Sequence, residues 1–278
     1  MPSRDQQRRD RWHAVDHDGH DIEPYDFPGA RALRGERVVP GLQMLHTPDD
    51  GRTIWTHVAA VPILDAHGTV AGHASVVQDI DAMKRTEDRQ AFLLEVSDAL
   101  RSISDPFEIQ RTATRILGEH LKANRVFYVV VEEDGDTAAI LDDYTNSVPS
   151  RAGRYSLSAF STHAVGEWRA GRAASTGDVN TDPRYSQSER EAYASVSTRA
   201  CFGIPLIKVG RLVALLGVNQ STPRRWTDYD IDLASEIAER TWAALERARA
   251  EQALATDLVH AERLRALAAQ LVSEETIE

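Results

Sequence analysis

The fold of this chain is decided by two apolar stretches, Ala200-Cys-Phe-Gly-Ile-Pro-Leu-Ile and Gly210-Arg-Leu-Val-Ala-Leu-Leu-Gly-Val-Asn. Each stretch has the length of a strand. Only Lys208 and Val209 separate the two, and Gly210 begins the second, so together they predict an antiparallel hairpin of buried strands with its turn at Val209-Gly210. Trp226-Thr-Asp-Tyr-Asp follows. Thr227, with an acidic residue three positions on, is typical of a helix N-cap, and we expect a long helix from there through Ala248.

The residues before the hairpin predict the rest of an α/β unit. Arg125-Val-Phe-Tyr-Val-Val-Val is β-branched and aromatic, as strands are. We expect further strands at 137–141 and 172–179, a short helix over 157–170 and a helical turn at 189–196. Two helices should precede them: an amphipathic one over 79–104, and one from a cap at Asp105-Pro106 to Ala123.

The first 85 or so residues are β-rich, with turn signals at regular intervals. Asp50-Gly51 and His67-Gly68 separate apolar stretches, as hairpin turns do. The stretch from Pro28 to Val39 suits one short helix that begins at the proline and ends near Gly35. Three strands should follow, at 42–45, 53–63 and 70–77.

The C-terminal stretch has a different pattern. Its apolar residues step by three or four positions, close to the 3.5-residue period of a coiled coil: Leu254, Leu258, Ala261, Leu264, Leu267 and Leu271. We therefore expect a parallel homodimer through the helices at 80–104 and 228–272. The alternative is that these helices pack on their own domain.

The composition argues against several classes of function. The net charge of −11 argues against nucleic-acid binding, because a phosphate backbone would be repelled. A lone cysteine, Cys201, excludes a disulfide framework and a CxxC zinc site and fits a reducing cytoplasm. No run approaches about 18 apolar residues and the charged N-terminus is unlike a signal peptide, so we expect a cytoplasmic protein with no membrane segment here.

Two resemblances then give the chain an organisation. Asp50-Gly-Arg-Thr-Ile-Trp, Ala60-Val-Pro-Ile-Leu-Asp and Gly68-Thr-Val-Ala-Gly resemble the end of a PAS domain. Asp178-Val-Asn-Thr-Asp-Pro-Arg and the hairpin with its terminal helix resemble a GAF domain. The implied fold is α+β: a PAS-like portion at 1–84, a linker helix at 85–104, a GAF domain with a central antiparallel sheet and flanking helices at 105–248, and a coiled-coil-like signalling helix at 249–278.

These resemblances imply a function. Such modules sense a small molecule or partner and pass the signal through linker helices to an output domain. We expect the input module of a two-component sensor histidine kinase, cut from a longer protein. A ligand-free dimerisation scaffold is the alternative. No ATP-binding glycine-rich box occurs, so we expect no enzyme activity in this chain, and a methionine sulfoxide reductase would need more cysteines than Cys201.

The GAF resemblance also implies where a ligand would bind. The pocket would be lined from the 157–170 helix, the 178–193 segment and the strand after Cys201, by Ser158, Thr162, Asp178, Tyr185, Tyr193 and Phe202.

Known cofactors of GAF domains leave patterns that this sequence departs from. Cys201 lies within a strand, and Asp178-Val-Asn replaces the Asp-Ile-Pro of bilin-binding domains, which argues against a bilin. Asn219-Gln and Asp228-Tyr lack the lysine and the acidic pair of cyclic-nucleotide domains, which argues against a cyclic nucleotide. We expect no certain cofactor, and a buried, small apolar role for the cysteine.

Two groups of histidines invite other hypotheses. His260 lies on a helix without the acidic residue directly after it that a phospho-acceptor has, so we interpret it as a surface residue. His13, His17 and His20 have a helical metal-ligand spacing, but Asp18-Gly19 breaks the helix, so we expect no metal.

Overall fold

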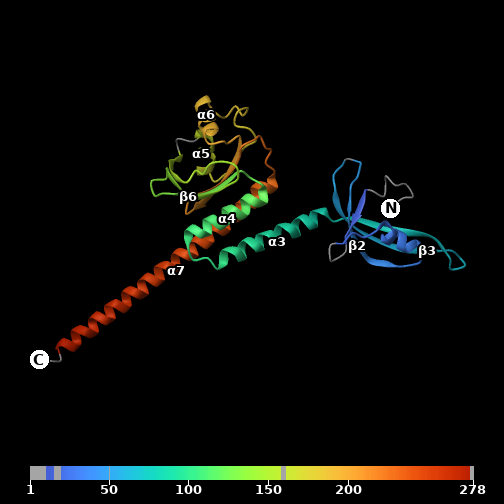
Figure 1. Ribbon diagram of the computed structural model, residues 1–278, viewed down its shortest axis with the longest axis horizontal. Coiled ribbons are helices and arrows are strands. Elements are labelled where there is room, and N and C mark those ends of the chain that lie inside the picture. Colours follow the sequence, from blue (N-terminus) through green and yellow to red (C-terminus); the bar gives the residue numbers. More distant parts are fainter. Residues whose placement is uncertain (1–10, 16–19, 50, 158–160, 276–278) are drawn as a thin grey trace. The chain divides into compact units, whose positions relative to one another are not determined.

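The computed structural model describes residues 11–15, 20–49, 51–157 and 161–275, and side chains as far as Arg265. The chain divides into two compact units, Met1–Ala91 and Phe92–Glu278 (Figure 1). Within the described ranges, every helix is either too short or too polar to span a bilayer.

The first unit is a four-stranded antiparallel sheet in the order β1-β2-β3-β4. The strands are β1 (Trp12–Ala14), β2 (Val38–His46), β3 (Ile54–Leu64) and β4 (Val70–Asp79), with a short 3-10 helix η1 (Pro24–Asp26) and helix α2 (Pro28–Leu33) between the first two. Thr56, Val58 and Ala60 alternate along β3 into a small core. The β-rich expectation is confirmed. Its comparison with a PAS domain stays a prediction.

The short helix of this unit begins at Pro28 and ends near Gly35, as the sequence predicts. Helix α2 stops at Leu33, and β2 has begun by Val38. The cause is Gly35, whose φ of +93° is a left-handed conformation that helices use to end and that suits glycine.

The second unit is built on a six-stranded antiparallel sheet in the order β7-β6-β5-β10-β9-β8. Its elements run along the chain as α3 (Asp81–Arg101, which begins in the first unit), α4 (Pro106–Leu121), β5 (Arg125–Val131), β6 (Thr137–Thr145), β7 (Gly153–Ser156), α5 (Thr162–Arg169), β8 (Ala174–Thr176), α6 (Gln187–Ser195), β9 (Ala200–Lys208), β10 (Arg211–Gln220) and α7 (Asp228–Glu275). The expected α+β class and the single antiparallel sheet with flanking helices are confirmed. Sequence patterns gave no signal for β7.

The helices of this unit begin where capping chemistry predicts. The Asp105 carboxylate accepts a hydrogen bond from the Phe107 amide at 3.1 Å, with Pro106 in the first turn. At the start of α7, the Asp230 carboxylate accepts from the amide and the hydroxyl of Thr227, both at 2.9 Å, and the Asp230 amide donates back to that hydroxyl at 3.2 Å. The predicted cap at Thr227 is therefore confirmed.

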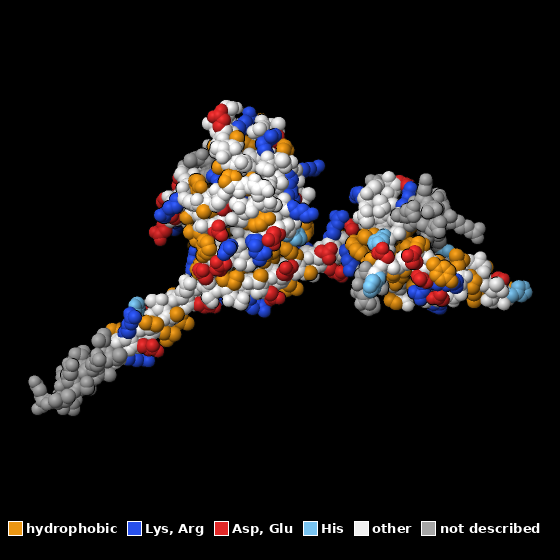
Figure 2. Space-filling view, in the orientation of Figure 1, with side chains coloured by type: hydrophobic (Ala, Val, Ile, Leu, Met, Phe, Trp, Pro, Cys, Tyr) orange, Lys and Arg blue, Asp and Glu red, His pale blue; other side chains and the backbone are white. Residues whose placement is uncertain are grey.

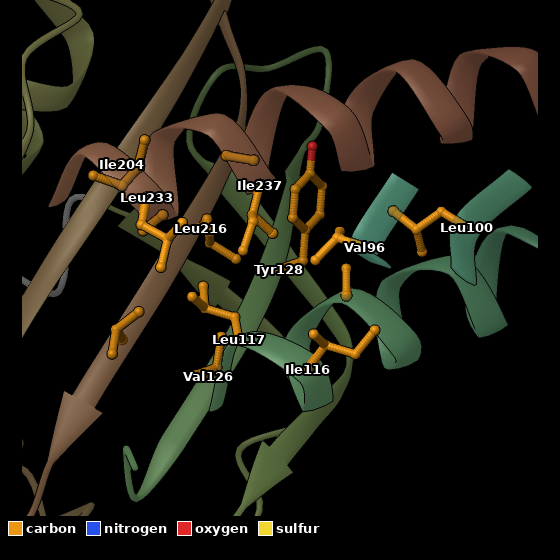
Figure 3. Close-up of a cluster of buried hydrophobic side chains, with 14 of the residues drawn as sticks. Val96, Leu100, Ile116, Leu117, Val126, Tyr128, Ile204, Leu216, Leu233 and Ile237 are labelled. Carbon is orange, nitrogen blue, oxygen red and sulfur yellow. The ribbon is translucent and has the colours of Figure 1, made fainter. Parts of the chain in front are cut away.

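One face of the sheet carries the main core. Side chains from α3, α4 and α7 meet those of the central strands there, and in Figure 3 they point toward one another: Val96, Leu100, Ile116, Leu117, Val126, Tyr128, Ile204, Leu216, Leu233 and Ile237. Burying each of these large side chains removes apolar surface from water and stabilises the folded state by about 1.5–3 kcal/mol. This face therefore carries the larger of the two cores on the sheet.

The opposite face of the same sheet is covered by smaller elements. Figure 1 shows α5 and α6 on this side and α4 and α7 on the other. A second core lies here, in which Val129, Ile140 and Leu215 from the sheet pack against Val165 and Trp168 from α5. Neighbouring residues of a strand point to opposite faces, so β5 and β10 each contribute to both cores.

Helix α7 is one continuous helix of 48 residues. The sequence predicts a helix over 228–272, with a domain part to Ala248 and a coiled-coil-like part after it, and both parts belong to α7. Glu251 to Ala253, at the junction, contain no glycine or proline that would interrupt the backbone. All side chains from Glu251 to Arg265 are exposed, and Figure 2 shows apolar side chains among charged ones along this part. Leu254 and Leu258 are 63% and 57% exposed.

Candidate ligand pocket

A cavity lies between the sheet and α5, on the face away from α4 and α7. Its volume is about 50 Å³. Its walls are mainly apolar and come from β5, β6, the residue after β7, α5, β8, β9 and β10: Phe127, Val129, Ala138, Ile140, Leu157, Ala164, Trp168, Ala174, Phe202 and Leu215. The sequence forms it because the residues of each strand that do not face the helices must face this side.

Two glycines form the floor of the cavity. Gly203 in β9 and Gly217 in β10 are paired across the hairpin. A Cβ atom at Gly203 would lie 2.8 Å from the indole of Trp168, and one at Gly217 would clash with the ring of Phe127. The absence of side chains therefore lets two aromatic rings lie directly on the sheet. These rings occupy space that a larger ligand could fill.

The far end of the cavity is polar. Tyr185 and Tyr193 meet edge to face, with ring centroids 5.4 Å apart, and both border the cavity beside Cys201. Burial raises the pKa of the Cys201 thiol to about 12, while hydrogen bonds with the two phenols oppose that shift. Burial also raises the pKa of both tyrosines. At neutral pH this end therefore offers neutral hydroxyl and thiol groups.

Arg151 brings a positive charge to the cavity wall. It is 7% exposed, and its guanidinium lies 5.1 Å from the ring centroid of Tyr155. The Tyr155 hydroxyl donates to the carbonyl oxygen of Arg151 at 2.8 Å. The backbone amide of Arg151 in turn donates to the Asp143 carboxylate at 2.8 Å. The loop that carries this arginine is thus held in place from two sides.

Asp143 also pairs with a second arginine. Arg125 Nε lies 3.4 Å from the Asp143 carboxylate, and neither side chain is exposed. Arg125 further donates to the carbonyl oxygens of Pro149, at 2.7 Å, and Val196, at 3.0 Å. Burial lowers the pKa of Arg125, and the charge of Arg151 lowers it further. This buried pair fastens the loops on both sides of the polar end to strand β5.

The structure places the six expected pocket residues in different surroundings. Tyr185, Tyr193 and Phe202 border the cavity, although the Phe202 ring also packs edge-on against Trp226 in the main core. Asp178 does not line the cavity and instead forms an ion pair with Arg199 at 2.6 Å.

Of the other two, Thr162 is exposed at the start of α5, where its amide donates to Glu189, and Ser158 lies outside the described residues. A role in ligand binding stays a prediction for all six residues. The expectation that Cys201 is a buried strand residue is confirmed.

Sequence reasoning missed the residues that shape the cavity most. Gly203 and Gly217 lie inside apolar strands, where glycine often marks a close approach of another group, so this signal was available. Arg151 is in a loop with no motif around it. Trp168 is in a short helix whose contacts depend on tertiary packing.

Other candidate sites are simpler. Among the described residues, no group of three or more His, Cys, Asp or Glu side chains could hold a metal ion. His17 lies outside those residues. His260 is exposed on α7.

These features define a small α+β domain with one antiparallel sheet, a helical face and a pocket face. The model of the GAF domain family matches residues 105–245. The chain therefore belongs to the GAF domain family. No curated protein matches it in sequence.

Two of the solved structures with the same fold come from cyanobacterial phytochromes. One is a phycoerythrobilin-bound GAF domain, with 16% identity and a TM-score of 0.51, covering 59% of this chain and 97% of that one. Another is a phycocyanobilin-bound GAF domain, with 17% identity and a TM-score of 0.50, covering 59% of this chain and 96% of that one.

These neighbours overturn the expectation that argues against a bilin. That expectation depends on the strand position of Cys201 and on Asp178-Val-Asn in place of Asp-Ile-Pro. Both features concern how a bilin is attached or oriented, and neither concerns whether a pocket of this fold takes one. GAF domains with this fold are solved with bilins bound, so judging a bilin unlikely on those two features was wrong.

Proposed function

We propose that this chain is a sensory module whose GAF domain binds a small molecule in the cavity beside α5. The bound state would be passed through the sheet to α3, α4 and α7. The observation that carries this proposal is that β5, β9 and β10 each contact the helical core with one face and line the cavity with the other. Phe127 faces the cavity and the adjacent Tyr128 faces the helices, so a shift of one strand changes both packings.

The lining suggests the chemistry of the ligand. Most of the wall is apolar, while Arg151, Asn219 and the two tyrosines are at or near one end. A largely apolar, planar molecule with an acidic group suits this arrangement, because the arginine can pair with a carboxylate. A linear tetrapyrrole has that chemistry, with a conjugated plane and propionate groups. The bilin-bound neighbours support it as the first ligand to test.

A ligand of that size needs the cavity to enlarge. Ligand pockets usually measure about 300–1,000 Å³, against about 50 Å³ here. The rings of Phe127 and Trp168 lie on bare glycine backbone, so their rotation would open space without moving the sheet. Binding would then be coupled to a rearrangement of aromatic rings next to the helical core.

The test is to mix the protein with biliverdin or phycocyanobilin and record absorbance and visible circular dichroism. Binding should give a shifted band with induced dichroism. Gly217→Leu, which places a large side chain where the Phe127 ring lies, should abolish it. Gly166→Ala, at an open surface position on α5, should leave it unchanged.

Protein purified from its own host should in parallel be extracted and its bound compounds identified by mass spectrometry. A folded protein that binds neither bilin and carries no compound would refute the ligand-binding function.

We further propose that the module serves a histidine kinase of a two-component system, as a parallel homodimer through its helices. The support is the continuous α7, with Leu254, Leu258 and Leu264 exposed at coiled-coil spacing. The kinase assignment is tested by whether the encoding gene continues into an H-box helix and an ATP-binding domain. A gene that continues into a different output domain would refute it.

A ligand-free dimerisation scaffold is the second candidate, and the small volume of the cavity favours it. It shares the helical dimer with the sensory proposal but predicts that bilins leave both the spectrum and the thermal unfolding of the protein unchanged.

A further inference from the structure

A second hollow lies on the surface of the GAF domain, away from the cavity beside α5. It measures about 410 Å³ and is open to solvent. It is formed by strand β8 and by the segment that leads into α7, and the two hollows have no lining residue in common. We call it the arginine groove, after Arg184, Arg224 and Arg225, which line it together with Ser175, Thr176 and Trp226.

The charge of this groove is opposite to that of the chain. Three arginines line it and, among the described residues, no carboxylate does, although Asp182 beside it neutralises Arg184; the net charge of the protein is −11. Guanidinium groups that converge on one hollow are suited to oxyanions, because each offers planar, paired N–H donors.

Two of the arginines are already held in position. The Arg184 guanidinium pairs with Asp182 at 2.5 Å and donates to the carbonyl oxygen of Ser175 at 2.8 Å. The Arg224 guanidinium donates to the carbonyl oxygen of Leu121 at 2.7 Å and lies 4.3 Å above the Trp226 ring centroid. Such fixed donors lose little freedom when a ligand binds.

The third arginine is free to bind. Arg225 is exposed, and none of its nitrogen atoms has a hydrogen bond or ion pair with any described residue. It therefore supplies an unneutralised positive charge beside two pre-positioned guanidinium groups.

We propose that the arginine groove is a binding site for a small molecule that carries phosphate groups. The site would act on the first turn of α7. Arg224 Nη2 lies 3.9 Å from Asp230 Oδ1, a loose pair, and Asp230 is the residue that caps α7 with Thr227. An oxyanion in the groove competes with Asp230 for Arg224 and so changes the electrostatics at the base of this helix. The groove thus gives the module an input separate from the cavity.

The test is calorimetric titration of the full chain with sodium pyrophosphate at constant ionic strength. Saturable binding is expected for the unaltered protein. Arg225→Gln should weaken it by about tenfold or more, since one charge-assisted contact is lost. Arg225→Lys keeps the charge and should fall between the two. The matched control is Arg263→Gln, an equal change of charge at an exposed position on α7 outside the groove, which should bind as the unaltered protein does.

Two results would overturn the proposal. The first is the absence of saturable binding. The second is an equal effect of Arg225→Gln and Arg263→Gln, which would mean that pyrophosphate responds only to overall charge. Circular dichroism of each variant checks that it is folded. Because neither result depends on a bilin, this test fails or succeeds independently of the ligand in the cavity.

Discussion

Replacing Asp143 with asparagine tests whether the buried ion pair with Arg125 organises the polar end of the cavity. The substitution keeps the shape and one acceptor oxygen but removes the negative charge. Arg125 would then be a buried cation without a counter-charge, since both side chains are fully buried. Breaking a buried pair from one side costs about 3–5 kcal/mol. Two carbonyl oxygens still accept from Arg125, so we expect the lower end, about 3 kcal/mol.

The loss should be measured on the GAF domain itself. Urea unfolding can be monitored by hydrogen exchange and mass spectrometry of peptides from β5, which reports on the unfolding of this domain alone. The matched control is Asp142→Asn, one residue away, where the side chain is 32% exposed and pairs with Arg111 at 3.8 Å. An exposed pair of this kind is worth about 0–1 kcal/mol. If Asp143→Asn cost no more than Asp142→Asn, the buried pair would not be what holds these loops.

Three further changes test other parts of the structure. Gly203→Ala would place a Cβ 2.8 Å from the Trp168 indole and should cost about 1–3 kcal/mol in urea unfolding, whereas Gly166→Ala has open space and should cost nothing. Burial raises the pKa of the Cys201 thiol to about 12 from about 9, so iodoacetamide should label it at least about 100-fold more slowly in folded than in unfolded protein at pH 8.5. The contribution of this shift to the free energy of unfolding is fully present below about pH 9 and is lost as the pH rises toward 12. Cys201→Ala should reduce that decline in stability. Leu258→Glu should turn the proposed dimer into a monomer by light scattering, and an unchanged mass would exclude this seam as the interface.

Much of the fold could be predicted because local rules and tertiary packing agree. The hairpin around Val209-Gly210 and the cap at Thr227 depend on neighbours in sequence, and both are present. The α4 cap at Asp105 is present for the same reason. By contrast, β7 is four residues long and is defined only by its pairing with β6. No local pattern marks such an edge strand.

The site was harder to predict than the fold. Tyr185 and Tyr193 could be placed near the cavity because the GAF resemblance locates their segment. Arg151 could not, because its position depends on hydrogen bonds between Asp143 and a loop eight residues further along the chain. Asp178 was expected in the pocket from its motif, but an arginine 21 residues away pairs with it. Residue type alone does not reveal which partner a charged side chain will have.

The unbroken α7 gives the domain a mechanical advantage. The residues from Ala248 to Glu275 belong to this single helix, and at 1.5 Å per residue they span about 40 Å. A tilt of about 10° at the domain end would swing the far tip by about 7 Å over such a length. A lever of this kind needs only a slight adjustment around Leu233 and Ile237, where the helix is anchored in the core. Under the proposed sensory function, small events inside the domain would thereby be enlarged at the far end of α7.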